Sequence, residues 1–314
     1  MTDKGRHVIF GAGQVGRELA RTLSARGLDV RLVSRGRPQA LPDGVAWQGA
    51  DAADPVAATE AAAGCAVVYQ CLNAPYTRWP ELFPPLQRGV LTAAEHADAL
   101  LVSLENVYGY GPASAQPMTE DLPLVATTVK GSTRAAMTSE LLTAAQSGRV
   151  RIAIGRASDF FGAGVTESTL GEQVFAKALA GKRADFIGDP DQLHTYSYVP
   201  DIAQGLATLG TDARSLGQVW HLPGPETVTT RQLLDIVSSH LGQRVSLRTI
   251  PSYALRMLGL VNPMMRALAE MEYEFTAPFV LDTSKYSGTF GPSGTPLATA
   301  VADTLEWYRN RSTA

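Results

Sequence analysis

The chain has 314 residues, of which 45% are hydrophobic, so it can bury one large core or two smaller ones. Its 27 basic and 30 acidic residues give a net charge of −3, which provides no overall field to attract nucleic acid or an anionic membrane. No apolar run reaches about 18 residues, so no transmembrane helix is expected.

Residues 7–34 are expected to form a strand, a glycine-rich turn, a helix and a second strand. The opening run HVIF suits a short buried strand of a parallel sheet. Apolar side chains then recur every four residues at Val15, Leu19 and Leu23, and Gly27 is placed to end the helix. The pattern predicts a βαβ unit.

The junction between this strand and helix carries Gly-x-Gly-x-x-Gly at Gly11, Gly13 and Gly16. In this context the first glycine permits a tight turn, the second lets backbone amides approach a pyrophosphate, and the third allows close packing of helix on strand. We therefore expect a dinucleotide cofactor here, bound by the three glycines and by Gln14 and Val15 beside them.

The end of the second strand bears on which dinucleotide is preferred. The sequence there is VSRGR over residues 33–37, with no Asp or Glu to accept from a ribose 2′-hydroxyl. Arg35 can pair with a 2′-phosphate and stack on adenine, whereas Arg37 fits a solvated loop residue equally well. The sequence favours NADP(H) over NAD(H).

Short apolar runs alternate with helical patterns as far as residue 154, with VVYQCL at 67–72, ALLVSL at 99–104 and VRIAI at 150–154. This alternation predicts an α/β fold, a Rossmann-type doubly wound parallel sheet with a smaller C-terminal substrate-capping region. We assign the core to 1–165 with returning segments near 196–222 and 278–290, the capping region to 166–195 and 223–277, and a C-terminal helix to 291–314.

Ligands of such sheets bind beyond the carboxyl ends of the strands. That rule draws attention to the polar segments that follow the third, fourth and fifth expected strands. They contain Asp51, then Leu72 and Asn73, then Glu105 and Asn106.

These segments, in this order, resemble the extended short-chain dehydrogenase/reductase family, which includes NAD(P)-dependent sugar epimerases and dehydratases. The likeness covers nearly the whole chain. The stretches that carry it are GAGQVG, ADAADP, ENVYGYG, GRASDFFG, YSYVPDIAQGLA, WHLPGPETVTTRQLLDIV and LDTSKYSGTFG.

The resemblance implies cofactor contacts at the two earlier loops. Asp51 would face adenine, and Leu72 and Asn73 would line the nicotinamide ribose. Both polar residues have a plain structural alternative, because Asp51 could cap a helix and Asn73 could stabilise the turn before Pro75.

The chain departs from the family where the family does its chemistry. The usual Ser or Thr three residues before Val107 is replaced by Leu104, and Ser103 should point to the other face of a regular strand. The usual Tyr-x-x-x-Lys helix carries Lys130 and Arg134 instead. This resembles the isoflavone reductase-like and NmrA-like branch, where a Lys-x-x-x-Arg helix occurs.

Lys130 is a candidate proton donor, since a helix N-terminus and Arg134 on the same face would both disfavour its ammonium. Alternatively, Lys130 and Arg134 could bind only the ribose and phosphates of the cofactor, or form a solvated pair. Tyr108 is a second candidate acid, although in the family this tyrosine more often packs under the substrate loop.

Four residues are candidates for substrate contact: Tyr76, Glu105, Asn106 and Tyr196. The stretch from 243 to 274 adds many Met, Leu and Tyr residues, which are expected either in the core or in an adaptable apolar pocket. We therefore expect an apolar or aromatic substrate.

The sequence supports three functional hypotheses. The first is an NADPH-dependent reductase of a carbonyl or activated double bond in an apolar or aromatic metabolite. The second is an NAD-dependent sugar-type epimerase or dehydratase, which the missing tyrosine weakens because such reactions need a strong base. The third is an NmrA-like dinucleotide sensor without catalysis.

The cysteines and the position of the first strand bear on the cellular location. Two cysteines, Cys65 and Cys71, are interpreted as reduced structural thiols, and no His or Cys residues stand at metal-ligand spacing. The first strand begins so early that a signal peptide is not expected. We expect a cytoplasmic monomer or homodimer with a small-molecule substrate and no metal.

Overall fold

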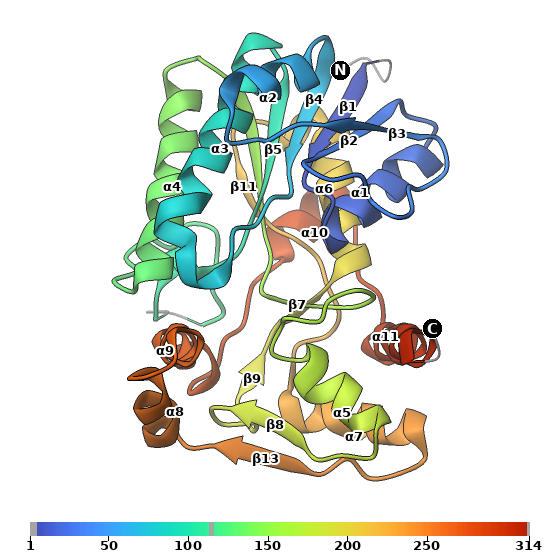
Figure 1. Cartoon of the computed structure of the whole chain (residues 1–314), viewed down its shortest axis with the longest axis vertical. Coiled ribbons are helices and arrows are strands. Elements are labelled where there is room, and N and C mark those ends of the chain that lie inside the picture. The colour runs from blue at the N-terminus through green and yellow to red at the C-terminus, as the bar shows by residue number, and fades with distance from the viewer. Residues whose placement is uncertain (1–4, 113–115, 313–314) are drawn as a thin grey trace.

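The computed structural model describes residues 5–112 and 116–312. Its upper part in Figure 1 is a seven-stranded sheet in the order β11-β6-β5-β4-β1-β2-β3, and every neighbouring pair is parallel. The strands are β1 (Arg6–Phe10), β2 (Val30–Ser34), β3 (Val45–Gly49), β4 (Cys65–Gln70), β5 (Leu100–Glu105), β6 (Arg151–Arg156) and β11 (Val219–His221). The predicted Rossmann-type α/β fold is therefore confirmed.

Helices cover both faces of this sheet, because successive side chains of a strand point to opposite faces. Ile9 of β1 packs in one core cluster with α1 (Gln14–Ala25) and α6 (Val199–Thr211). Val8 packs in the other cluster, with α2 (Pro55–Ala62), α3 (Trp79–His96) and α4 (Val129–Gln146). The central strands β1, β4 and β5 are thus buried on both faces, which explains their continuous apolar sequences, whereas most residues of the edge strand β3 are half-buried or exposed.

A smaller group of elements lies below the sheet in Figure 1 and has a core of its own. Its paired strands are β7 (Asp159–Phe161) with β10 (Tyr196–Tyr198), β8 (Ala184–Ile187) with β13 (Leu247–Ile250), and β9 (Leu193–His194) with β12 (Val228–Thr229). Its helices include α5 (Lys177–Leu179), α7 (Thr230–Leu241), α8 (Ser252–Gly259), α9 (Pro263–Glu270), the 3-10 helix η5 (Glu272–Phe275) and α11 (Leu297–Ser312). The helix α10 (Ser284–Phe290) returns to the sheet beside β11.

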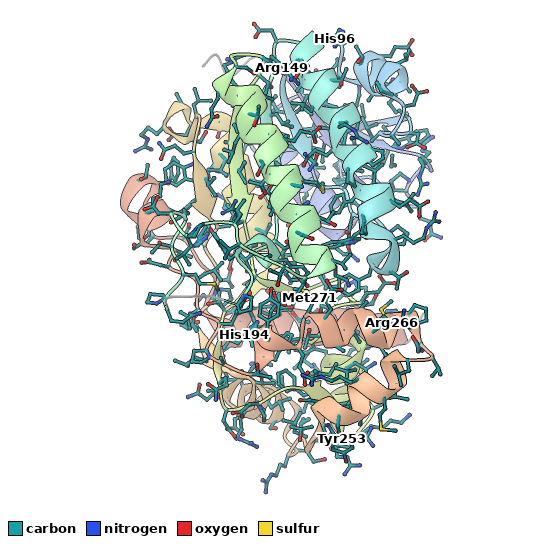
Figure 2. All side chains as sticks on the ribbon, turned by 90° about the vertical axis from the view of Figure 1, so that its left-hand side faces the viewer. His96, Arg149, His194, Tyr253, Arg266 and Met271 are labelled. Atoms are coloured by element: carbon teal, nitrogen blue, oxygen red, sulfur yellow. The ribbon has the colours of Figure 1, made fainter. Side chains whose placement is uncertain are left out.

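The apolar residues of α8 and the turn after it form an outer surface. Tyr253 is 70% exposed, Leu260 77% and Val261 84%, although Leu255 between them is buried. Figure 2 shows Tyr253 at the far end of the molecule from the sheet. The expectation that this stretch fills the core or lines a pocket is therefore wrong for its exposed residues, whereas Leu255 and Met271 are buried. The exposed ones are Tyr253, Met257, Leu258, Leu260 and Met264.

None of the helices in the described ranges is long and apolar enough to cross a membrane.

Candidate active site

A cleft of about 550 Å³ lies at the carboxyl ends of the central strands. Its lining comes from the turn after β1, the end of β2, and the loops after β3, β4 and β5. This is the edge where parallel α/β sheets bind their ligands. Gly11, Gly13, Gln14, Val15, Arg35, Asp51, Leu72, Asn73, Glu105, Asn106 and Arg134 all line it.

The glycine turn has the geometry that the motif predicts. Gly11 has φ +111°, and a Cβ atom there would lie 2.4 Å from the backbone oxygen of Cys71. A Cβ atom on Gly16 would lie 1.8 Å from the Gly11 oxygen, so only glycine lets α1 approach the strand this closely. At Gly13, by contrast, a Cβ atom would meet no protein atom within 4 Å. The second glycine therefore faces the open cleft.

The N-terminus of α1 opens onto the same cleft. Gly13 is its N-cap residue and provides no side-chain cap, and the first turn contains no acidic residue. Free amides and the positive end of the helix dipole favour an anion at this point. Gln14 is held by its Nε2, which donates to the oxygen of Gly164 at 2.7 Å, while Val15 is buried.

One end of the cleft is bounded by Arg35 and Asp51, both exposed. The Asp51 carboxylate accepts from the Ala53 amide at 3.0 Å, so it also shapes its own turn. Arg37 is not in the lining; its guanidinium lies 5.9 Å from the centroid of the Trp47 ring. Of these two arginines, only Arg35 therefore borders the cleft.

The opposite end is formed by Leu72, Asn73, Leu104, Asn106 and Phe160. Asn73 Oδ1 accepts from the Ala74 amide at 3.0 Å, and Asn106 Oδ1 accepts from the Tyr108 amide at 3.3 Å. Both amide side chains therefore stabilise their own loops and also border the cleft.

In β5 the position that carries a Ser or Thr in the family is occupied by Leu104. Leu104 lines the cleft, whereas Ser103 is fully buried on the other face and accepts from Gln70 Nε2 at 3.3 Å. The period of the strand therefore keeps the Ser103 hydroxyl out of the cleft, as the sequence predicts.

Arg134 reaches the cleft from α4. Its Nη2 donates to the Leu104 oxygen at 3.3 Å, and its guanidinium lies 4.8 Å from the centroid of the Phe83 ring. Burial lowers the pKa of this guanidinium, and its Nε has no hydrogen-bond partner among the described residues. A buried cation with a free donor beside the cleft is suited to a ribose hydroxyl or phosphate.

Lys130, one turn earlier, does not line the cleft. Its Nζ contacts Glu270 Oε2 at 3.2 Å and the Ala267 oxygen at 3.3 Å, and it lies 4.5 Å from the centroid of the Tyr76 ring. The Lys130 amide also donates to Glu270 Oε1 at 2.7 Å. The ammonium is therefore held between α4 and α9.

Tyr108 and Tyr76 lie beside the cleft but outside its lining. The Tyr108 ring stacks on Trp79 with centroids 5.8 Å apart, and the two phenols interact with each other. Burial raises the pKa of Tyr108 well above its usual value, and nearby carboxylates raise it further. At neutral pH Tyr108 is a protonated phenol and a weak acid.

Two other candidates have structural partners. Glu105 Oε2 accepts from Thr138 at 2.7 Å and pairs with Arg156 at 3.4 Å, so this carboxylate supports the floor of the cleft. Tyr196 does not lie at the cleft: it is 2% exposed in the core of the capping region, and its hydroxyl lies 2.7 Å from that of Thr230. The structure thus gives no support for Tyr196 as a substrate contact.

Two aromatic residues that the sequence offers as lining, Trp79 and Phe160, do line the cleft. Glu270 and Glu274, which approach the site from the capping region, were not anticipated. They could not be found from the sequence pattern, because Lys130 and Tyr108, which they approach, are more than 100 residues away in the chain.

The sheet, the glycine turn and the cleft define a Rossmann-type fold, the class of fold whose cleft at this edge suits a dinucleotide. The sequence profile of the NAD dependent epimerase/dehydratase family matches residues 8–221. The chain therefore belongs to the NAD dependent epimerase/dehydratase family. None of the curated protein sequences matches the chain significantly.

Solved structures share the fold over nearly their full length. The enzyme WbmH of Bordetella bronchiseptica in complex with NAD⁺ has a TM-score of 0.74 at 18% identity, with 98% of each chain covered. The dTDP-glucose 4,6-dehydratase DesIV of Streptomyces venezuelae has a TM-score of 0.79 at 17% identity, also with 98% of each chain covered. UDP-glucuronic acid 4-epimerase of Bacillus cereus has a TM-score of 0.77 at 16% identity, covering 98% of this chain and 99% of the other.

Proposed function

We propose that the protein is an NADPH-dependent reductase acting on the carbonyl or activated double bond of an apolar or aromatic metabolite. The proposal rests on the replacement of the catalytic groups that are usual in the family. Leu104 faces the cleft in place of a Ser or Thr, and Lys130 and Arg134 take the helix positions of the Tyr and Lys. Reduction needs a hydride donor and a proton donor but no strong base to oxidise a hydroxyl. The nicotinamide would supply the hydride.

Residues of this chain would bind the cofactor and supply the proton. The Gly11–Gly16 turn and the α1 N-terminus would hold the pyrophosphate, and Arg134 the nicotinamide ribose. Lys130 would donate the proton once its ammonium leaves Glu270 and turns toward the cleft. Tyr108 is the alternative donor. Apolar lining residues support the substrate class: Leu72, Ala74, Pro75, Trp79, Leu82, Phe83, Leu104 and Phe160.

The preference for NADPH is proposed from Arg35. It borders the cleft at the end of β2, where no carboxylate of that strand opposes a 2′-phosphate. We expect NADPH to bind wild-type protein at least about tenfold more tightly than NADH, as one good ion pair provides. Arg35→Ala should remove this difference in a fluorescence titration, whereas the control Arg37→Ala should keep it.

The role of Lys130 has a separate test. Lys130→Met should retain NADPH binding but lose at least about 100-fold in kcat for carbonyl reduction, the usual contribution of a general acid. The exposed lysine Lys182 of the capping region offers the matched control, Lys182→Met. Full turnover by Lys130→Met with normal NADPH binding would leave Tyr108 or water as the donor.

The second candidate function is a sugar-type epimerase or dehydratase with tightly held NAD. The family match and the solved structures named for such reactions favour it. The composition of the cleft weighs against a nucleotide-sugar substrate, since its described lining has only two cations, Arg35 and Arg134. Purified protein carrying NAD⁺ and isomerising or dehydrating a sugar nucleotide without net cofactor use would support this alternative.

A further inference from the structure

Glu274 of η5 is a buried carboxyl group without a matching partner. The residue is 1% exposed, and its Oε1 has no hydrogen-bond partner among the described residues. A carboxyl group in such a position loses its hydration without gaining a protein donor in exchange. A position of this kind is unfavourable for folding alone, and is therefore a candidate for ligand binding.

The surroundings of Glu274 are three phenols and one further carboxylate. An ionised Glu274 raises the pKa values of Tyr76, Tyr108 and Tyr273, while burial and then Asp159 raise the pKa of Glu274 itself well above its usual value. The Tyr273 hydroxyl also has no hydrogen-bond partner in the described part of the chain. Groups from the core loops and from the capping region thus meet around Glu274.

The nearest charged side chains are bound elsewhere. Asp159 Oδ2 lies 2.7 Å from His194 Nε2, within hydrogen-bond distance. The His194 ring is stacked on Phe275, with centroids 4.7 Å apart. Lys130 is bound to Glu270 and to a backbone oxygen. Figure 2 shows His194 and Met271 where the lower end of α4 meets the capping elements. No ion pair to Glu274 is found within the described ranges.

This group of residues lies directly beside the cleft. Trp79 lines the cleft, stacks on Tyr108, and meets Tyr76 edge-on with centroids 5.4 Å apart. Phe160 also lines the cleft, and Asp159 precedes it in β7. Trp79 and Phe160 thus connect the cleft lining to the residues around Glu274.

We propose that Glu274, together with the Tyr273 and Tyr108 hydroxyls, binds a hydrogen-bond-donating group of the substrate, a hydroxyl or a protonated amine. The inference rests on the proposed function, since the nicotinamide is assigned to the cleft. A carboxyl oxygen accepts a hydrogen bond from either group, and the phenols can donate or accept beside it. A phosphate or carboxylate on the substrate would find no free cation among the described residues here, because Lys130 is bound to Glu270. The substrate class is therefore hydroxy or amino carbonyl compounds.

The test compares three ketones that differ only in the distal group: acetophenone, 4-(hydroxymethyl)acetophenone and 4-(aminomethyl)acetophenone. Their dissociation constants are measured by calorimetry in the NADP⁺ complex, which cannot reduce them. In wild-type protein at least one ketone that carries a donor should bind at least tenfold more tightly than acetophenone, and which one does so distinguishes hydroxyl from amine. Glu274→Leu should abolish that preference, and Glu306→Gln, an exposed change on α11, should leave it intact.

A second measurement distinguishes ligand binding from a structural role. The melting temperature of the ligand-free Glu274→Leu variant should equal or exceed that of wild type, because a carboxyl without a partner is removed. A lower melting temperature with an unchanged ketone preference would overturn the proposal. Equal binding of all three ketones to wild-type protein would also overturn it, even if NADPH reduces acetophenone. Donor-dependent binding without reduction by NADPH would retain the site and reject the reductase.

Discussion

Single residues of the glycine turn have different roles although they look alike in sequence. Gly16 is fixed by packing, since a Cβ atom there would overlap the Gly11 oxygen, whereas Gly13 faces open space. Gly16→Ala should therefore lose roughly 3 kcal/mol of unfolding free energy, at the upper end for overpacking.

Gly13→Ala should fold normally and bind the dinucleotide at least about tenfold more weakly, because its methyl group would occupy the approach to the pyrophosphate. Urea denaturation and a dinucleotide titration separate the two effects. Gly288→Ala, where a Cβ atom also meets nothing, is the control. Normal dinucleotide affinity in Gly13→Ala would contradict the assignment of the cleft.

His221 makes stability depend on pH. Burial lowers its pKa from 6.5 to about 4, and its ring nitrogens lie 2.7 Å from the Tyr110 hydroxyl and 3.0 Å from the Asp282 oxygen. The folded state holds the imidazole neutral, so its contribution to stability is full above the unfolded pKa and is lost as pH falls from about 6.5 toward 4.

As the pH falls from 7 to 5, His221 should therefore lower the free energy of unfolding by roughly 2 kcal/mol. Urea denaturation at both pH values measures the change, and His221→Gln should reduce it. A variant with the same pH dependence as wild type would show that other groups are responsible.

At the scale of elements, the contact between α4 and α9 joins the core to the capping region. Glu270 binds both the ammonium and the amide of Lys130, which is 3% exposed. The hydrogen bond from the Lys130 amide to Glu270 caps the N-terminus of α4 from outside the helix. Thr128 caps it from within the chain, since its hydroxyl accepts from the Gly131 amide at 3.1 Å.

Glu270→Gln should therefore lose roughly 2 kcal/mol of unfolding free energy, since it leaves a buried ammonium without its counter-ion. Lys130→Met combined with Glu270→Gln should recover part of the loss, and the double-mutant cycle by chemical denaturation measures the coupling. The exposed pair of Arg78 and Glu81 provides a control cycle, which should show a much smaller coupling. Equal couplings would mean that the α4–α9 contact is no stronger than a surface ion pair.

At the scale of the whole molecule, the sheet could be predicted from the sequence, but the contacts between the capping region and the core could not. The buried strands and the glycine turn follow from local patterns, because parallel strands are continuous apolar runs and the turn has fixed spacing. The opposite orientations of Ser103 and Leu104 follow from the period of a strand. Local pattern therefore predicted most of the candidate residues that line the cleft.

The capping region was predicted less well for a physical reason. Whether an apolar helix faces the core or solvent depends on tertiary packing, so the exposed residues of α8 could not be distinguished from core residues by composition. The pairing of Lys130 with Glu270, and the position of Glu274 near Tyr108, depend on contacts across more than 100 residues. Periodicity in a single sequence carries no information on such contacts.

Reduction of a carbonyl or activated double bond at the expense of NADPH is the proposed activity of the protein. The most direct measurement incubates the protein with NADPH deuterated at nicotinamide C4 and a panel of aromatic and aliphatic ketones, aldehydes and enones, and examines the products by mass spectrometry. We predict that deuterium from one face of C4 moves to the reduced carbon, with one NADP⁺ formed per product. The proposed reductase activity would be contradicted if NADPH bound but stayed unoxidised across the panel, while protein-bound NAD⁺ supported turnover of a sugar nucleotide.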